Sequence, residues 1–144
     1  MKRIITVALL LALPLLIQAD DDNGFGAAGV LSNKNSEDLP EVTVSSGEPL
    51  LDESKLTLQS GKYYEWEFTS DGSQELSLAG AGFLHAIWID EIVIEGLEIR
   101  PLGLDSIEFD EAGTVEISFL AIKPGTYKFG VPGRESQTLE ITIK

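Results

Sequence analysis

Apolar and polar residues alternate with a period of two along most of the chain after residue 40. In residues 62–70, for example, Tyr64, Trp66 and Phe68 are separated by polar side chains. A period of two places alternate side chains on opposite faces of a strand, whereas a helix would show a period near 3.6 residues. Since no long segment has the helical period, the pattern predicts an all-β domain.

Turn signals divide this pattern into short strands. Asp71-Gly72 is typical of a hairpin turn, and Lys123-Pro124-Gly125 combines a fixed φ with a flexible glycine. The segments between the turns are residues 41–45, 55–59, 62–70, 74–78, 83–94, 114–122, 126–131 and 139–143. About eight short strands with such spacing predict one β-sandwich domain over residues 41–144.

The N-terminal residues have the pattern of a secretory signal. Lys2 and Arg3 precede an apolar run over residues 4–17, and Ala19 offers a small residue for cleavage. We therefore predict a signal peptide over residues 1–19, with an uncleaved membrane anchor as the alternative. The polar, aperiodic residues 20–40 predict a flexible acidic leader. The expected location is periplasmic or secreted, with no membrane contact after cleavage.

Composition narrows the range of partners. The 144 residues contain no cysteine, so no disulfide framework stabilises the domain. The formal net charge is −14 and becomes −16 once the two positive charges of Lys2 and Arg3 are removed. Such a surface repels nucleic acid and anionic lipid and favours a cationic protein, for example a basic cytochrome or transporter domain.

Three segments between residues 58 and 144 resemble a cupredoxin domain, most closely the copper domain of cytochrome c oxidase subunit II. Residues 59–62, Q-S-G-K, resemble the turn before an aromatic strand of that family. Residues 83–91, F-L-H-A-I-W-I-D-E, resemble its H-x-x-W-x-x-E segment, and residues 119–129 resemble its F-x-x-x-K-P-G-x-Y segment. The resemblance implies a Greek-key β-sandwich of about eight strands with a copper site at one end.

The resemblance also implies a set of copper ligands, and most of them are missing. His85 matches the first histidine ligand. Val131 occupies the position of the cysteine, Gly133-Arg134 that of the second histidine, and no methionine follows. An electron-transfer copper site requires the thiolate, so the sequence excludes a type 1 or dinuclear copper centre. We therefore expect no cofactor.

His85 is the only histidine of the chain, and it has two interpretations. In the first, it closes the end of the sandwich with a hydrogen bond. In the alternative, it is a metal ligand that binds copper(II) weakly with carboxylates such as Asp90, Glu91 or Glu95. Alternation places Glu91 on the same strand face as His85, but about 20 Å away along an extended strand. We therefore favour the structural role.

Two aromatic features of the sequence have a functional or a structural interpretation. Trp66 and Trp88 could line a ligand site, but we expect core positions, because Trp66 is in phase with its aromatic neighbours. Tyr127 follows Pro124-Gly125 and resembles the tyrosine corner of Greek-key sandwiches, which is a structural feature.

The acidic residues do not indicate an active site. Asp105, Glu108, Asp110 and Glu111 surround a predicted turn without an apolar cleft, so we expect a solvated face rather than an acid–base pair. The sequence thus predicts that the chain is not an enzyme but a binding or accessory module. The alternative is a copper(II)-binding or carrier protein that uses His85.

Overall fold

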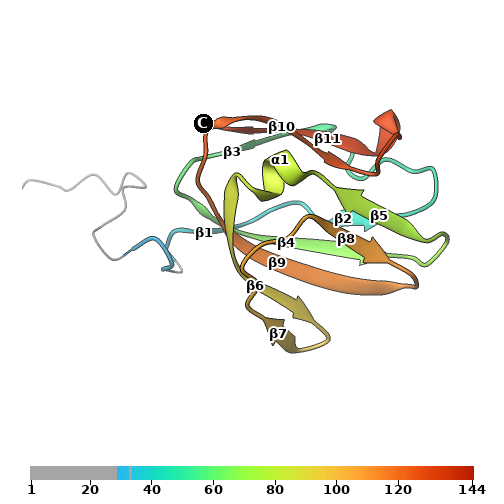
Figure 1. Ribbon diagram of the computed structural model, residues 1–144, viewed down its shortest axis with the longest axis horizontal. Coiled ribbons are helices and arrows are strands. Elements are labelled where there is room, and N and C mark those ends of the chain that lie inside the picture. The colour runs from blue at the N-terminus through green and yellow to red at the C-terminus, as the bar shows by residue number, and fades with distance from the viewer. Residues whose placement is uncertain (1–28, 33) are drawn as a thin grey trace, which may run out of the picture.

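The computed structural model describes residues 29–32 and 34–144 and confirms the all-β sandwich. The predicted signal peptide, and residues 20–28 of the predicted leader, lie outside the described residues. Two sheets pack face to face, and the polypeptide passes repeatedly from one to the other (Figure 1). None of the helices in the described part is long and apolar enough to cross a membrane.

The first sheet has six strands, in the order β1-β4-β9-β6-β7, with β2 also paired to β4. Their bounds are β1 Ser36–Asp38, β2 Val42–Val44, β4 Tyr63–Ser70, β6 Ile87–Ile94, β7 Leu97–Ile99 and β9 Gly113–Ala121. Both β1 and β2 run parallel to β4, one beside its beginning and the other beside its end. Together they cover one edge of β4.

The second sheet has five strands, in the order β3-β11-β10-β5-β8. Their bounds are β3 Lys55–Leu58, β5 Leu76–Ala79, β8 Ser106–Phe109, β10 Gly125–Gly130 and β11 Thr138–Ile143. A single helical turn, α1 (Ala81–Leu84), connects β5 to β6, and a 3-10 turn, Glu135–Gln137, precedes β11.

An aromatic cluster fills the space between the sheets. Trp66 is buried and lies 4.6 Å from Phe68, 5.7 Å from Phe129 and 6.1 Å from Phe83, measured between ring centroids. Its indole Nε1 donates a hydrogen bond to the Pro40 carbonyl at 3.0 Å, which satisfies the one polar atom of the ring. Trp66 is therefore a core residue, as predicted. The core position expected for Trp88 was wrong: Trp88 is 44% exposed on the outer face of the first sheet, because it alternates with the buried Ile89.

The turn before β10 has the predicted tyrosine corner. Tyr127 Oη donates a hydrogen bond to the Lys123 carbonyl at 2.9 Å and so ties the strand to its own turn. Gly125 is required there, because a Cβ atom at this position would lie 2.7 Å from the Tyr127 hydroxyl. The role of Tyr127 in the described structure is structural.

Three short strands were not predicted from the sequence. β1 lies inside residues 20–40, the range assigned to a leader, so the sandwich begins before residue 41. β7 and β8 are the other two. The predicted strand over residues 83–94 begins only at Ile87, because Phe83 and Leu84 are consecutive and both buried, which a helical turn permits and an alternating strand does not.

A β-bulge in β6 changes the predicted faces of that strand. Ile89 pairs with Phe119 and Glu91 pairs with Ser118, so Asp90 is the extra residue. Because of this insertion, Glu91 lies on the outer face of the sheet. The bulge therefore interrupts the predicted alternation from His85 to Glu91, and the face that this alternation assigned to Glu91 was wrong.

Candidate functional site

His85 lies on the surface at the end of α1. Its Nε2 atom is 3.1 Å from Oδ1 of Asp105, and the side chains are 64% and 83% exposed. The next residue, Ala86, accepts backbone hydrogen bonds from Ile122 and Lys123, which places His85 beside the turn that precedes β10. The structure therefore pairs His85 with Asp105, a residue that the sequence analysis did not connect to it.

The carboxylates proposed as co-ligands of His85 have other partners. Arg100 binds Asp90 at 2.9 Å and Glu91 at 2.7 Å. Glu95 lies in the turn of the β6–β7 hairpin, so β6 separates it along its whole length from His85. None of the three contributes to a site at His85.

The other positions carried over from the cupredoxin pattern are also remote from His85. Val131 is buried directly after β10, and Arg134 binds the side chains of Gln137 and Gln74. His85 lies beside the beginning of β10, whose six residues span about 20 Å when extended. These residues do not fit a type 1 copper, because they supply neither a thiolate nor a second imidazole near the first.

The outer face of the first sheet is strongly acidic. Glu67 on β4 pairs directly with Glu116 on β9, and Glu65 lies one outward position further along β4. Partial burial, followed by the charges of Glu65, Glu67, Glu91 and Asp38, raises the pKa of Glu116 above its ordinary value. Like charges directly opposite one another destabilise a sheet. We call this surface, formed by Asp38, Glu65, Glu67, Glu91 and Glu116, the acidic face.

A tyrosine and an arginine lie at one side of the acidic face. Tyr63 Oη donates a hydrogen bond to Asp90 at 3.0 Å, and Asp90 in turn binds Arg100. Burial, opposed by a hydrogen bond with Ser118 and supported by Asp90, raises the pKa of Tyr63 to about 12. The phenol therefore stays neutral over the physiological pH range.

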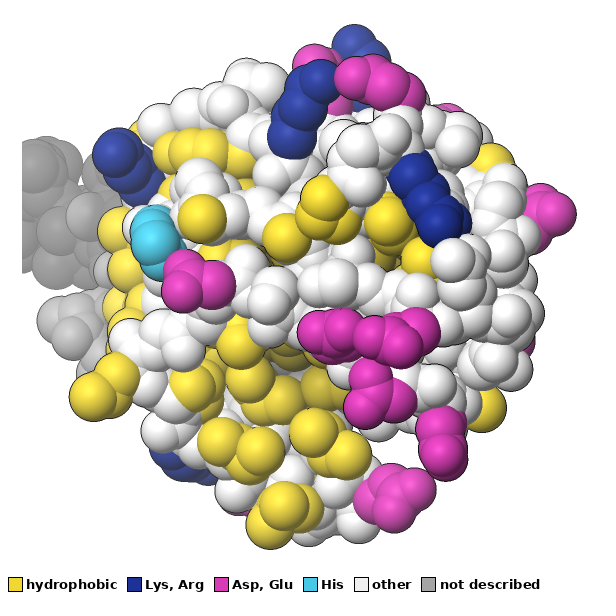
Figure 2. Space-filling model, turned by 45° about the vertical axis from the view of Figure 1, so that its right-hand side comes forward, with side chains coloured by type: hydrophobic (Ala, Val, Ile, Leu, Met, Phe, Trp, Pro, Cys, Tyr) yellow, Lys and Arg dark blue, Asp and Glu magenta, His cyan; other side chains and the backbone are white. Residues whose placement is uncertain are grey.

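An apolar groove of about 630 Å³ opens between β8 and the β6–β7 hairpin. Figure 2 shows hydrophobic side chains gathered around a hollow, with Asp and Glu side chains along one side of it. Ile92, Ile99, Ile107 and Phe109 are among the residues that line it. The prediction that no apolar cleft lies near these acidic residues was therefore wrong. The signal was present, since Ile107 and Phe109 alternate with Glu108, but the segment is only four residues long.

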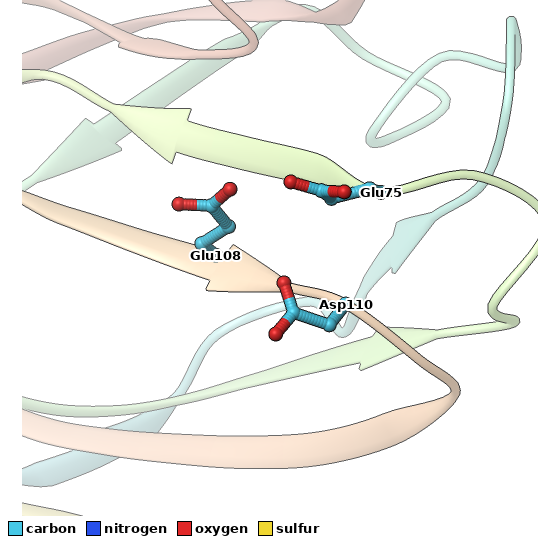
Figure 3. Close-up of side chains that lie close together, drawn as sticks. All are labelled: Glu75, Glu108 and Asp110. Carbon is cyan, nitrogen blue, oxygen red and sulfur yellow. The ribbon is translucent and has the colours of Figure 1, made fainter.

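Three carboxylates form a cluster beside the groove. Glu108 and Asp110 come from β8 and its end, and Glu75 comes from the start of β5 (Figure 3). Their oxygen atoms lie within 4.8 Å of one another, and all three residues are exposed. A hydrogen bond with Glu75, and then its charge, raises the pKa of Glu108. Glu108 and Asp110 were predicted to lie on one solvated face, whereas the approach of Glu75 was not predicted.

Comparison with known proteins identifies the fold. No family model and no curated protein sequence matches the chain. Among solved structures, it is similar to a multicopper oxidase from Pseudomonas thermotolerans, with a TM-score of 0.55 and 14% identity over 76% of this chain and 30% of the oxidase. A multicopper oxidase from Campylobacter jejuni has a TM-score of 0.52 and 10% identity, with the same coverage of both chains.

A third similar structure is Fet3p, a multicopper oxidase that functions in iron import. Its TM-score is 0.52, with 13% identity over 65% of this chain and 22% of that protein. The chain thus spans less than a third of each of these oxidases. At such low identity the similarity shows the fold alone.

The chain has a cupredoxin-like β-sandwich fold, as the sequence resemblance implied. The closer resemblance to the copper domain of cytochrome c oxidase subunit II stays a prediction, because the similar structures are multicopper oxidases.

Proposed function

We propose that the chain is a non-enzymatic, exported binding module that docks a cationic protein on its acidic face. The observation that carries this proposal is the set of carboxylates across β4, β9 and β6, in which Glu67 and Glu116 stand directly opposite each other. The carboxylates of this surface repel one another in the free protein. A positively charged partner reduces this repulsion, which makes its binding more favourable.

Two further observations support a binding role. The cupredoxin-like scaffold is retained, while the residues at the expected ligand positions provide no thiolate and only one imidazole. The strongly negative net charge extends beyond the acidic face and would accelerate the approach of a basic partner through long-range attraction. Within this proposal, the N-terminal residues 1–19 direct export to the periplasm or the exterior.

A basic c-type cytochrome is a suitable probe for the proposed site. We expect one-to-one binding at low salt that weakens steeply toward about 0.3 M salt, where the Debye length has fallen to a few ångströms. The double variant Glu67→Lys with Glu116→Lys should reduce the affinity at least about tenfold, because it replaces two attractive charges by repulsive ones. Isothermal titration calorimetry measures both effects.

The matched control is Glu53→Lys, an exposed residue next to β3 in the other sheet. It changes the net charge in the same direction without altering the acidic face. If Glu53→Lys weakened binding as much per substitution as the double variant, the attraction would come from net charge alone and the acidic face would not be a docking site.

A copper(II)-binding role is a second candidate, and the exposed pair His85–Asp105 favours it. Imidazole nitrogen together with carboxylate oxygen is a reasonable donor set for copper(II). For this role, titration followed by electron paramagnetic resonance should show one copper per chain with nitrogen coupling, lost in His85→Ala and weakened in Asp105→Asn. Binding that persists in His85→Ala would assign the metal to scattered surface carboxylates and remove this candidate.

A further inference from the structure

The apolar groove forms because the edge strands of the two sheets, β7 and β8, are offset from each other. Among residues 29–32 and 34–144, β8 is the last strand of the second sheet and pairs only with β5, and β7 is the last strand of the first sheet and pairs only with β6. The β6–β7 hairpin projects past β8 (Figure 1), and no strand in the described part of the chain lies opposite its inward face.

The uncovered face of the hairpin is apolar. Ile92 pairs with Ile99 and Ile94 pairs with Leu97, which places these four side chains on one face. Ile92 is nearly buried, whereas Ile94, Leu97 and Ile99 are 42%, 63% and 40% exposed. Such contiguous exposed apolar residues on an edge hairpin are characteristic of an interaction surface. A strand added to β8 would cover them.

The other face of β8 has the opposite chemistry. Ile107 and Phe109 line the groove, and Glu108 and Asp110 also border it. Alternation directs the Glu108 side chain toward the outer face, where it joins Glu75 and Asp110. A strand lying along the free edge of β8 would therefore have every second side chain in the apolar groove. The side chains between them would lie beside the carboxylate cluster.

We propose that β8 binds a strand from a partner protein in which apolar residues alternate with Lys or Arg. Backbone hydrogen bonds to the free edge of β8 provide the affinity, the groove takes the apolar side chains, and the carboxylate cluster selects the basic ones. The proposal rests on the binding role inferred above, but its residues are distinct from those of the acidic face.

The probe is a capped hexapeptide of alternating valine and lysine, added to the purified chain and followed by NMR and amide hydrogen exchange. We expect saturable one-to-one binding and slower exchange of amides in Ser106–Phe109. A peptide of alternating valine and glutamate should bind at least about tenfold more weakly because of like-charge repulsion. A valine–lysine peptide that is N-methylated on the amides facing β8 should not bind.

Charge reversal in the protein tests the selectivity. Glu108→Lys should reverse the selectivity of the protein, so that the valine–glutamate peptide binds better than the valine–lysine peptide. Ile99→Asp places a charge on the groove wall and should weaken both peptides, while Glu53→Lys should leave their ratio unchanged. All three positions are exposed, and thermal unfolding checks that each variant is folded.

Three results would overturn the proposal. They are binding that survives N-methylation, a preference that does not respond to Glu108→Lys, and a dimer of the free chain that already protects the β8 amides. In the last case the occupant is a second copy of the chain. Peptide binding that is retained in the Glu67→Lys and Glu116→Lys variant, while the cytochrome is lost, separates this site from the acidic face.

Discussion

Gln137 is fully buried and connects two loops that are distant in sequence. Its Nε2 atom donates hydrogen bonds to the carbonyls of Ser45 and Glu48 at 2.8 and 2.9 Å, and its Oε1 atom accepts one from Arg134 at 3.0 Å. Every polar atom of the amide therefore has a partner, which is what a buried polar side chain requires.

We predict that Gln137→Leu lowers the free energy of unfolding by about 1–3 kcal/mol, because it removes the buried amide that donates to the carbonyls of Ser45 and Glu48. Urea denaturation measures the change. Gln59→Leu is the matched control, since Gln59 is exposed and should change stability by less than about 0.5 kcal/mol. Equal effects of the two substitutions would mean that water replaces the lost amide.

Glu95 is the only non-glycine residue with a positive φ among residues 29–32 and 34–144. Its φ of 48° and the φ of 80° at Gly96 form the two-residue turn between β6 and β7. Two consecutive positive φ values occur in type I′ hairpin turns, where asparagine is strongly preferred at the first position. Glutamate is strained there, because its Cβ atom disfavours this conformation.

Replacing Glu95 with asparagine should therefore raise the free energy of unfolding by about 0.5–1 kcal/mol. Thermal unfolding at neutral pH provides the measurement. Glu53→Asn has no such strain to relieve and serves as the reference. A Glu95→Asn variant no more stable than that reference would show that the turn is not strained.

At the scale of the strands, the acidic face makes β4 and β9 sensitive to pH. The folded protein holds the pKa of Glu116 above its unfolded value, so folding favours the protonated form. The stability associated with this proton is fully present below the unfolded pKa, near 4.3, and is lost as the pH rises through the folded pKa. The charged form of Glu116 opposes the pairing of the two strands, because Glu67 lies directly opposite it.

We predict that Glu116→Gln raises the melting temperature at pH 7 and low salt, and that its advantage disappears below about pH 4, where the carboxyl is protonated. Added salt should reduce the advantage as well, because it screens the repulsion from Glu65 and Glu67. Calorimetric melting at several pH values tests this. An advantage independent of both pH and salt would show that the amide acts through packing instead.

The long strands were predictable because each has one buried face. Tyr64, Trp66 and Phe68 alternate with polar residues in β4, and the structure buries all three. β1 could not be found in this way, because its sequence Ser-Glu-Asp has no apolar residue and its place depends on backbone pairing with β4. A parallel partner distant in sequence leaves no local signal.

The candidate sites were less predictable than the strands. Pairing of His85 with Asp105, and of Glu75 with Glu108, depends on how segments 20 to 33 residues apart meet at the surface. The bulge at Asp90 also reversed the expected face of Glu91, because one extra residue shifts all the following side chains. The period of two therefore predicts the face of each side chain only up to the next β-bulge in the strand.

At the scale of the whole molecule, we propose that the sandwich has two docking surfaces, each of which binds a different part of a basic partner. The acidic face lies on the outer face of the first sheet. The apolar groove and the carboxylate cluster beside it lie between β8 and the β6–β7 hairpin. A folded basic domain would suit the first surface and an extended segment the second. Binding both at once would raise the overall affinity through effective concentration.

The position of β11 determines when the fold can form. This strand, Thr138–Ile143, lies inside the second sheet between β3 and β10, and its parallel pairing with β3 joins Glu140 to Lys55 and Ile143 to Leu58. During synthesis, about 85 further residues must therefore be added after β3 before β11, its parallel partner, is available for pairing. The second sheet can therefore form only after β11 has been synthesised, and such non-local pairing predicts refolding in milliseconds to seconds rather than microseconds. Stopped-flow measurement of the tryptophan fluorescence, to which the buried Trp66 contributes, would give the refolding rate. Before β11 is synthesised, the unfolded chain is accessible to chaperones and proteases.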